Sequence, residues 1–448
     1  MICLSPQEAE SAIESLQQFL RFPTVSAISP TSGAYRDCAN YILHELASIP
    51  CLEDIHFLPE SPEHSPVVIA HWKGTRPELP VILLNSHYDV VPASLEEWTV
   101  PPFEGLRRDG KIYGRGSQDM KCVCIQYIEA IRYLNRQGFQ PTRTLYLTFV
   151  PDEEVGGGGM AAFLESELFK HQLPGIALAL DEGLASTDDT FSVFYGERLP
   201  WWVDITAVGN TGHGSRFIEE TAVEQLLEMA NKALEFRDGQ RRLLFSNPSH
   251  ENCSHAVAAK KKSLGDVTSL NITRIQAGVQ VGNSYAYNCV PPTASCSLDI
   301  RISPHTSPSD IGEMLDIWCR ECSKSDIHKV TWKFTEGPNG KPFNQAGEHA
   351  TTSTDVSINP WYAIFVESMS RMNLEFRPQV FPAATDSRFL RALGIRALGF
   401  SPMRNTEVML HENDEYIPEE TFLEGISVYV GLLKDLSSQA DMDEDTLK

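Results

Sequence analysis

Histidines and carboxylates occur along most of this 448-residue chain in short motifs whose side chains suit a hydrolase with two metal ions. Divalent ions such as zinc bind imidazole nitrogen and carboxylate oxygen, and one carboxylate can bridge two of them. Two bridged ions ~3.5–4 Å apart activate a water molecule, and a further carboxylate accepts its proton. The motifs and their candidate residues are SHYDVV (His87, Asp89), GRGSQDMK (Asp119), VPDEEVGGGG (Glu153, Glu154), LDEGLA (Glu182) and LHENDEY (His411).

Most of these motifs, taken singly, have a simpler structural interpretation. A pair such as His87 and Asp89 is more often a hydrogen bond within the protein than part of a catalytic site. Asp119 stands in a Gly-x-x-Asp sequence that suits a turn or a helix cap. His411 has acidic neighbours that would equally suit a surface patch, and the residues 181–182 (Asp-Glu) leave open which carboxylate faces a metal.

The adjacent pair Glu153 and Glu154 is more informative. It follows an apolar run, where two acidic residues placed only for solubility are not expected. Residues 156–159 are all glycine, which allows the backbone to come close to a ligand. Together the motifs supply five candidate ligands and one spare glutamate, and this combination indicates an enzyme.

The length and the charge of the chain restrict its possible partners. A chain of 448 residues is too long for one simple core and predicts two domains. The net charge of −23 argues against a nucleic-acid partner, which would need a basic surface. No segment has the ~20 apolar residues that cross a membrane, and the first residues do not resemble a signal peptide. Ten scattered cysteines without such a signal indicate reduced thiols in a cytoplasmic protein.

The first part of the chain has the pattern of an α/β domain. The sequence SPQE at residues 5–8 is typical of a helix start with a capping box. Residues 81–84 and 144–150 are apolar runs that predict buried parallel strands, and residues 122–135 predict a helix. Candidate ligands follow the two runs, and ligand sites in open α/β sheets lie at the carboxyl ends of strands.

The pattern changes after residue 195 and returns later to α/β. The middle part predicts an α+β domain with an antiparallel sheet. Its strands are expected at residues 202–208, 269–275 and 294–302, and its helices at 222–236 and 310–323. A last helix is expected at 419–436, followed by a flexible acidic tail at 437–448. The catalytic domain is therefore predicted to be discontinuous, with parts at 1–195 and 338–448 and an inserted domain at 196–337.

Several long motifs resemble those of one enzyme family over nearly the whole chain. They are ILLNSHYDVVP, GSQDMKCV, TFVPDEEVGG, ALDEG, FYGERLPWW, GHGSRF, PAATDSRF, ALGFSPM and LH-x-x-DE. The chain is similar to the co-catalytic di-zinc amidohydrolases and peptidases, which include the aminoacylases, glutamate carboxypeptidase and the desuccinylases, and it most resembles the aminoacylases. The resemblance implies a discontinuous α/β, di-zinc peptidase-like catalytic domain with an inserted α+β domain. That inserted domain would be a lid and would form the interface of a homodimer.

The resemblance also assigns a role to each candidate residue. Asp119 would bridge two Zn²⁺ ions per subunit, and the peptide bond that follows it would be cis. His87 and Glu182 would complete one site, and Glu154 and His411 the other. Glu153 would be the general base, and Asp89 would orient His87.

The inserted domain and the segment after it would hold the substrate, a small N-acyl amino acid. His213 in the motif TGHGS would reach the active site of the partner subunit and stabilise the oxyanion. On its own, a histidine between glycines is more often a turn residue. The positions that match substrate-binding residues are Asn288 in YNCVP, Arg301 in LDIRI, and Thr385 and Arg388 in AATDSR.

Three functions are compatible with these motifs. The first is zinc-dependent hydrolysis of the amide bond of N-acyl-L-amino acids to a carboxylate and a free L-amino acid. The second is a dipeptidase or carboxypeptidase of the same family, which would share every metal ligand. The third is an inactive binding relative, which would have lost a ligand or the general base, and none is lost here.

One residue and two loops depart from the family's pattern. Tyr88 stands where the most similar relatives have a small hydroxyl residue, and it is expected to alter the rim of the site. Residues 252–262 and part of 337–355 look like loop insertions. Because both loops are distant in sequence from the ligands, they are expected to affect the lid or partner contacts and not the chemistry.

Overall fold

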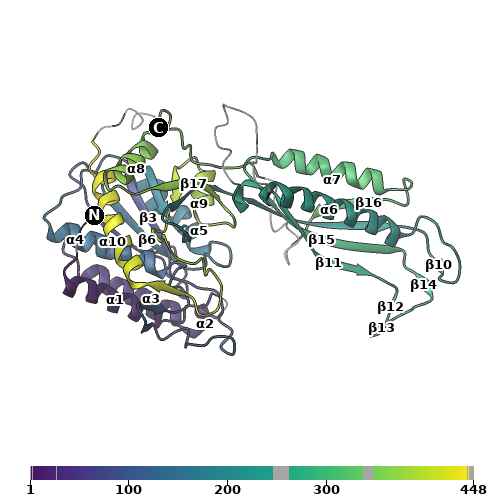
Figure 1. The fold of residues 1–448 in the computed structure, drawn as a ribbon, viewed down its shortest axis with the longest axis horizontal. Helices are drawn as coiled ribbons and strands as arrows, with labels where there is room; N and C mark the ends of the chain where they lie inside the picture. The colour runs from purple at the N-terminus through teal and green to yellow at the C-terminus, as the bar shows by residue number, and fades with distance from the viewer. Residues whose placement is uncertain are drawn as a thin grey trace, which may run out of the picture. The chain divides into compact units, whose positions relative to one another are not determined.

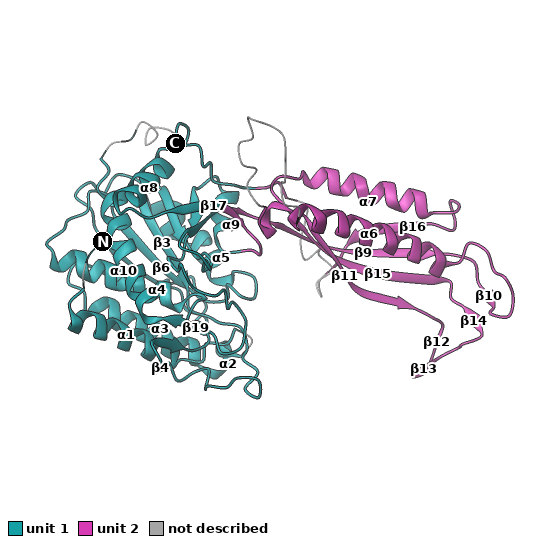
Figure 2. Cartoon of the chain, in the orientation of Figure 1, with its two compact units in different colours: residues 1–195, 350–378, 385–448 teal, residues 196–349, 379–384 magenta. Residues whose placement is uncertain are grey.

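The computed structural model divides the chain into two compact units (Figure 2). It describes residue 2 and residues 4–26, 28–245, 262–336, 347–440 and 442. Unit 1 comprises Met1–Tyr195, Ala350–Pro378 and Thr385–Lys448, and unit 2 comprises Gly196–His349 and Gln379–Ala384. Most of the two expected loop insertions and of the expected acidic tail lies outside the described residues.

A mixed sheet of eight strands forms the centre of unit 1 (Figure 1). The order of its strands is β1 (Glu53–Phe57), β2 (Val68–Trp72), β6 (Leu145–Val150), β3 (Val81–His87), β7 (Ile176–Asp181), β18 (Ala397–Gly399), β8 (Phe191–Glu197) and β17 (Phe376–Phe381). The four strands β6, β3, β7 and β18 pair in parallel, and β1 and β2 are antiparallel at one edge.

Helices cover both faces of this sheet. They are α1 (Pro6–Leu20), α2 (Ser29–Ser32), α3 (Ala34–Ala47), α4 (Lys121–Arg136), α5 (Gly158–Glu165), α8 (Pro360–Arg371), α9 (Ser387–Ala392) and α10 (Glu419–Ser437), with the π-helical turn η1 (Leu168–Gln172). Ile82 and Leu84 pack in one apolar cluster with residues of α1, α3, α4, α8 and α10. Val81 and Leu83 pack in another with residues of α5 and α9. Every residue of β3 is therefore buried, as expected of a parallel strand covered on both sides.

The elements predicted for this unit are confirmed. Helix α1 begins at the predicted place with the predicted capping box, in which Ser5 and Glu8 each accept the backbone N–H of the other. The apolar runs are β3 and β6, and the helix predicted after the Asp119 motif is α4. The predicted last helix is α10.

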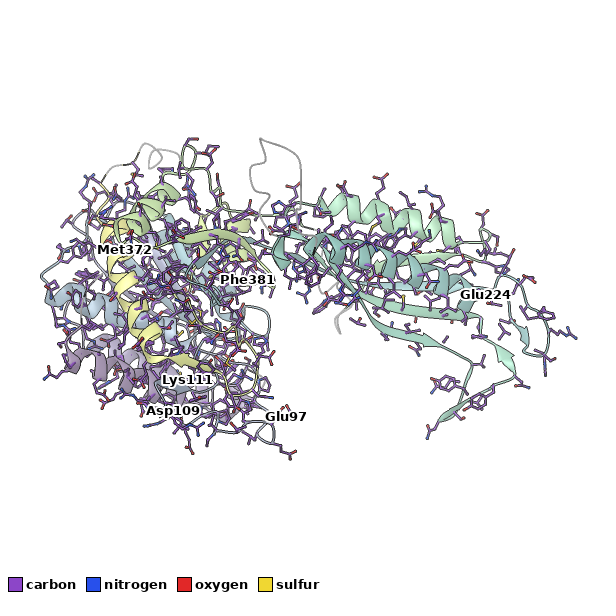
Figure 3. The ribbon with its side chains drawn as sticks, in the orientation of Figure 1. Glu97, Asp109, Lys111, Glu224, Met372 and Phe381 are labelled. Atoms are coloured by element: carbon purple, nitrogen blue, oxygen red, sulfur yellow. The ribbon has the colours of Figure 1, made fainter. Side chains whose placement is uncertain are left out.

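A small sheet joins two segments that are far apart in the chain. β19 (Tyr416–Pro418) pairs antiparallel with β5 (Lys111–Tyr113), which pairs with β4 (Leu106–Arg108). The Nζ of Lys111, labelled in Figure 3, lies 3.7 Å from the centre of the Tyr416 ring. This pairing places the segment before β19, which contains His411, next to the segment that leads from β5 to Asp119.

Unit 2 is an α+β domain with an antiparallel sheet of four strands. Their order is β11 (Ser269–Ala277), β15 (Thr293–Ile302), β9 (Leu199–Val208) and β16 (Val330–Phe334). Alternate residues of β15 are buried in a cluster shared with the helices α6 (Ala222–Phe245) and α7 (Pro308–Cys322). The shorter elements are β10 (Gly212–His213) paired with β14 (Cys289–Val290), β12 (Gln280–Val281) paired with β13 (Ser284–Tyr285), and the 3₁₀ turn η2 (Leu264–Asp266). The strands and helices predicted here are confirmed, and α6 is longer than predicted.

The structure also bears on the membrane and on the cysteines. Within the described ranges, no helix combines the length and the apolar character needed to span a bilayer. The cysteines of those ranges are free thiols, both in the buried α4 (Cys122 and Cys124) and on the exposed β14 (Cys289). The expectation of reduced thiols agrees with this arrangement.

Candidate metal centre

The candidate metal ligands all lie in unit 1, at the carboxyl edge of its sheet or in segments beside it. Three strand ends and two connecting segments provide them. They are His87 at the end of β3, Glu154 in the turn after β6 beside the candidate base Glu153, Glu182 after β7, Asp119 two residues before α4, and His411 before β19. Their side chains are buried except that of His411, which is 54% exposed.

Asp119 lies between the two histidines with one carboxylate oxygen toward each. Its Oδ1 is 3.0 Å from Nε2 of His87, and its Oδ2 is 3.4 Å from Nε2 of His411. His87 Nε2 is also 3.4 Å from Oε2 of Glu182, and His411 Nε2 is 3.2 Å from Oε2 of Glu154. Ligand atoms around a tetrahedral zinc ion are ~3.3 Å apart, so these separations suit two ions that share Asp119.

The electrostatics of the carboxylates also fit bound cations. Burial raises the pKa of Glu182 well above its ordinary value, and the Asp119 charge raises it further. Burial and then the Glu182 charge do the same for the pKa of Glu153. Burial and the Asp119 charge raise the pKa of Glu154 to about 7. Because these groups cannot all ionise together without added positive charge, the donor set fits two divalent ions.

Asp89 contacts both the ring of His87 and the backbone of the glutamate pair. His87 Nδ1 lies 3.0 Å from the backbone oxygen of Asp89 and 3.4 Å from its Oδ1. The same carboxylate accepts the backbone N–H groups of Glu153 and Glu154, both at 3.2 Å. The Ser26 hydroxyl donates to its Oδ2 at 2.8 Å. Asp89 therefore holds the first histidine and the glutamate pair in one arrangement, and Ser26 is a residue of this arrangement that the motifs did not indicate.

The structure distinguishes the two carboxylates at residues 181–182. Asp181 accepts hydrogen bonds from Nδ2 of Asn85 at 3.0 Å and from the Ser387 hydroxyl at 2.8 Å. Its lone pairs are thus directed to neutral donors inside the unit. Glu182 is the one that approaches His87. The candidate ligand of the pair is therefore Glu182.

Glu415 holds the loop that contains Asp119. The peptide bond between Asp119 and Met120 is cis, as the resemblance implies. The Glu415 carboxylate is fully buried and receives four donors from this loop. They are the backbone N–H groups of Gly116 (3.0 Å), Gln118 (2.7 Å) and Asp119 (3.3 Å), and Nη1 of Arg115 (2.9 Å).

The interpretation of the acidic residues around His411 as a surface patch is wrong for Glu415. Glu415 is buried in the contacts just described, and Asp414 accepts the backbone N–H and the hydroxyl of Thr99, both at 2.8 Å. Both side chains fix the loop of His411 to other segments. The sequence could not show this, because the donors are distant in the chain.

The segment before and within α9 lies beside the centre, since its Ser387 donates to Asp181. Thr385 is buried, and Arg388 is half-buried with its Cζ 4.5 Å from the centre of the Phe389 ring. Asp386 was not singled out in the sequence. It is 1% exposed, neither carboxylate oxygen has a hydrogen-bond partner among the described residues, and burial and the Asp181 charge raise its pKa to about 7.

Two of the three candidate substrate residues of unit 2 lie together. His213 is in the β10–β14 ladder, and the Gly214 N–H donates to the backbone oxygen of Asn288 at 2.7 Å. Both His213 and Asn288 are exposed. Arg301 lies toward the other end of the ten-residue strand β15, which spans ~33 Å. Its Nε and Nη2 donate to Asp299 at 2.8 and 3.1 Å, so the structure does not bring Arg301 to His213 within unit 2.

The expectation for Tyr88 is wrong. Its side chain is fully buried and does not line the rim of the site. The hydroxyl donates to the backbone oxygen of Pro66 at 2.6 Å, and the ring packs edge-on against Tyr35 with centroids 5.4 Å apart. Successive side chains of an extended segment point to opposite sides, so Tyr88 points away from the side of the candidate ligand His87. A large side chain is therefore accommodated there.

Comparisons with known proteins identify relatives along the whole chain. The sequence model of Peptidase family M20/M25/M40 matches residues 83–435. Aminoacylase-1 of Mus musculus is 41% identical over 443 residues, which are 98% of each chain, and Aminoacylase-1 of Dictyostelium discoideum is 44% identical over 377 residues, 83% of this chain and 86% of that one.

Solved structures of the same family share the fold. The M20 family metallo-carboxypeptidase Sso-CP2 from Sulfolobus solfataricus matches with a TM-score of 0.65 and 19% identity, over 97% of this chain and 100% of that one. The Bacillus subtilis YXEP protein, a dinuclear metal binding peptidase from the M20 family, matches with a TM-score of 0.64 and 14% identity, over 97% and 100%. At these identities the likeness concerns the fold.

The geometry predicts two zinc ions per chain and the loss of one in His411→Ala. The variant keeps His87, Asp119 and Glu182, but it removes the only imidazole from the second set of ligands. Mass spectrometry of metals after dialysis measures the ratio. His44→Ala, on the exposed side of α3 with 82% of its side chain exposed, is the control and should bind two ions. One ion per chain at saturating zinc, with full activity, would contradict the two-metal assignment.

Glu415→Gln is expected to weaken zinc binding although Glu415 is not a ligand. The change leaves Arg115 buried without its charged partner, which typically costs ~3–5 kcal/mol. Loss of a residue that orients a ligand typically lowers metal affinity ~10–100-fold. Competition with a chelator measures the affinity. Asp435→Asn, which removes the partner of the exposed Arg371, should leave the affinity unchanged, and equal affinities in all three proteins would mean that Glu415 does not position Asp119.

Proposed function

Since the chain belongs to peptidase family M20/M25/M40, we propose that it hydrolyses the amide bond of N-acyl-L-amino acids to a carboxylate and a free L-amino acid. The predicted resemblance to the co-catalytic di-zinc family is confirmed. The single observation that supports the substrate class is the 41% identity to mouse Aminoacylase-1 over 98% of both chains. The chain keeps every candidate ligand and the spare glutamate in one cluster, so an inactive relative is not favoured.

Two Zn²⁺ ions per subunit are the proposed cofactor. Asp119 would bridge them, His87 and Glu182 would complete one site, and Glu154 and His411 the other. When bound, the ions would supply Lewis acidity that makes a water molecule more acidic and neutralises charge developing on the carbonyl oxygen. The separations of 3.0–3.4 Å between the candidate donor atoms support this assignment.

Glu153 is the proposed general base. It accepts a proton from water as the water oxygen bonds to the carbonyl carbon, and it passes the proton to the amide nitrogen as the carbon–nitrogen bond breaks. Both water protons finally reside on the amine, and the products are a carboxylate and an ammonium. Asp89 supports this role because it holds the backbone of Glu153 and the ring of His87 at once.

Arg388 is the stronger candidate for binding the α-carboxylate of the substrate, with Thr385 beside it. Among the described residues, the Arg388 guanidinium has no hydrogen bond or ion pair, whereas Nε and Nη2 of Arg301 donate to Asp299. A guanidinium binds a carboxylate through two parallel hydrogen bonds. Arg301 would take part only after leaving Asp299.

A homodimer with shared active sites is the proposed assembly. His213 would donate to the oxyanion in the partner's site, a contact worth ~2.7–4 kcal/mol in comparable enzymes, and Asn288 would lie with it. The proximity of these two exposed residues on unit 2 supports a common role. Unit 2 would then be the lid and the dimer interface. A cytoplasmic location remains a prediction from the reduced cysteines.

The alternative, a dipeptidase or carboxypeptidase, has weaker support. The solved structures that match include a carboxypeptidase, but at 19% identity that likeness shows the fold alone. Turnover of N-acetyl-L-methionine compared with that of a plain dipeptide, at equal zinc, distinguishes the two functions. Faster cleavage of the dipeptide would overturn the proposed substrate class.

Glu153→Gln is expected to bind two zinc ions, to keep the fold and to lose ~10²–10⁴-fold in kcat. The carboxamide is nearly isosteric with the carboxylate but cannot accept the proton. Turnover of N-acetyl-L-methionine, circular dichroism and metal content are measured on one preparation. Glu165→Gln, an exposed residue at the end of α5, is the control. A rate close to that of the wild type would exclude Glu153 as the base.

A mixture of His213→Ala and Glu153→Gln subunits is expected to regain activity that neither variant has alone. A mixed dimer would contain one site with both an intact Glu153 and an intact His213. The recovered rate should approach a quarter of the wild-type rate at equal mixing, because about half of the dimers are mixed and each has one intact site. Subunit exchange is verified with two different affinity tags. If exchange occurs and no activity returns, the sites are not shared.

A further inference from the structure

Tyr35 contacts both of the loops that hold the candidate base and the first histidine, although it is not near them in sequence. It is the second residue of α3 and is fully buried. Its hydroxyl donates to Oδ1 of Asp152 at 2.9 Å. Its ring packs edge-on against that of Tyr88, which separates His87 from Asp89. Tyr35 thus joins α3 to the two strand ends β3 and β6.

The Asp152 backbone is the point at which the chain turns toward Glu153. Its φ is +64°, in the left-handed region that residues other than glycine rarely adopt. Its backbone oxygen accepts the N–H of Gly157 at 2.7 Å, which closes the turn. Because Glu153 is the next residue, the orientation of Asp152 determines the direction in which the Glu153 side chain leaves the backbone.

Two aspartates fix the conformation of this turn, one from outside it and one within it. Asp89 accepts the N–H groups of Glu153 and Glu154, and Ser26 donates to Asp89. Asp152 is the residue before Glu153, and its carboxylate accepts the hydrogen bond of Tyr35. Burial and the charges of Asp89 and Asp152 raise the pKa of Tyr35 well above its ordinary value, so its hydroxyl keeps the proton that it donates.

We propose that Tyr35 is a positioning residue for the general base: its hydrogen bond to Asp152 and its contact with Tyr88 fix the distance between the Glu153 turn and the His87–Asp89 segment. The inference rests on the proposed function of Glu153. Tyr35 touches neither the reacting atoms nor the candidate ligands. Its loss should therefore lower the rate of the chemical step and leave substrate binding and metal content unchanged.

The test compares Tyr35→Phe with Tyr41→Phe. The first change removes only the hydroxyl that reaches Asp152. The second removes a hydroxyl on the same helix that donates to the backbone oxygen of Ser15 at 3.0 Å, away from the centre. With N-acetyl-L-methionine, kcat of Tyr35→Phe is expected to fall roughly tenfold or more, because small displacements of a catalytic group are costly. KM should stay within about twofold, with two zinc ions bound, and Tyr41→Phe should match the wild type.

A double-mutant cycle with Asp152 shows whether the hydrogen bond is responsible. Asp152→Asn keeps an acceptor oxygen and tolerates the left-handed conformation, so it should retain most of kcat. Asp152→Ala should lose as much as Tyr35→Phe, and the double variant Tyr35→Phe/Asp152→Ala should lose no more than either single variant.

Three outcomes overturn the proposal: an unchanged kcat in Tyr35→Phe, a loss that follows the metal content, or losses that multiply in the double variant. A wild-type protein that cleaves no N-acyl amino acid would instead overturn the proposed function. The two failures are therefore distinguishable, and Asp152→Ala remains informative if Tyr35→Phe does not fold.

Discussion

Negative charge that must be buried at one edge of a sheet is the constraint on which unit 1 depends. The carboxylates there are of two kinds. Asp89, Asp181 and Glu415 receive their hydrogen bonds from backbone N–H groups or from neutral or cationic side chains. Asp119, Glu154 and Glu182 face histidines and one another, with Glu153 close by. Hydrogen-bond donors of the protein satisfy the first group, whereas the second group suits bound cations. The division separates residues that build the loops from the candidate metal ligands.

The loops at this edge are also held in uncommon backbone conformations. Asp152, His411 and Asp414 have φ values of 64°, 63° and 55°. Residues other than glycine keep such conformations where the surroundings determine them, and they gather at functional sites. Each of these three positions adjoins a side chain of the centre or supplies one. Asp152 accepts a hydrogen bond from Tyr35, and Asp414 accepts one from Thr99. These contacts maintain the backbone conformations of the two aspartates.

The strands and helices that the sequence predicted depend on local patterns, and the roles of the candidate ligands came from the family resemblance. β3 and β6 are short apolar runs, and the motifs other than that of His411 lie at the end of a strand or precede a helix. The supporting residues have no such signal. Ser26 is 63 residues from Asp89, Tyr35 is 117 from Asp152, and Gln118 is 297 from Glu415. Only the fold brings them together. Helix α6 exceeded its prediction for a related reason: its polar end, where Gly239 would favour a stop, is held by Thr268, whose N–H donates to Gln240 at 3.0 Å.

The order of synthesis differs from the order of strands in the sheet. β7 and β8 follow each other in the chain, but β18 lies between them. β18, His411 and Glu415 are all made after residue 384, the last of unit 2. The four-stranded sheet of unit 2 lies wholly between residues 199 and 334. On the ribosome, this inserted sheet is complete while the larger sheet still lacks a middle strand. The candidate metal centre is therefore completed only after unit 2 has been made, and a nascent chain that stops before residue 411 has no second histidine to offer a metal.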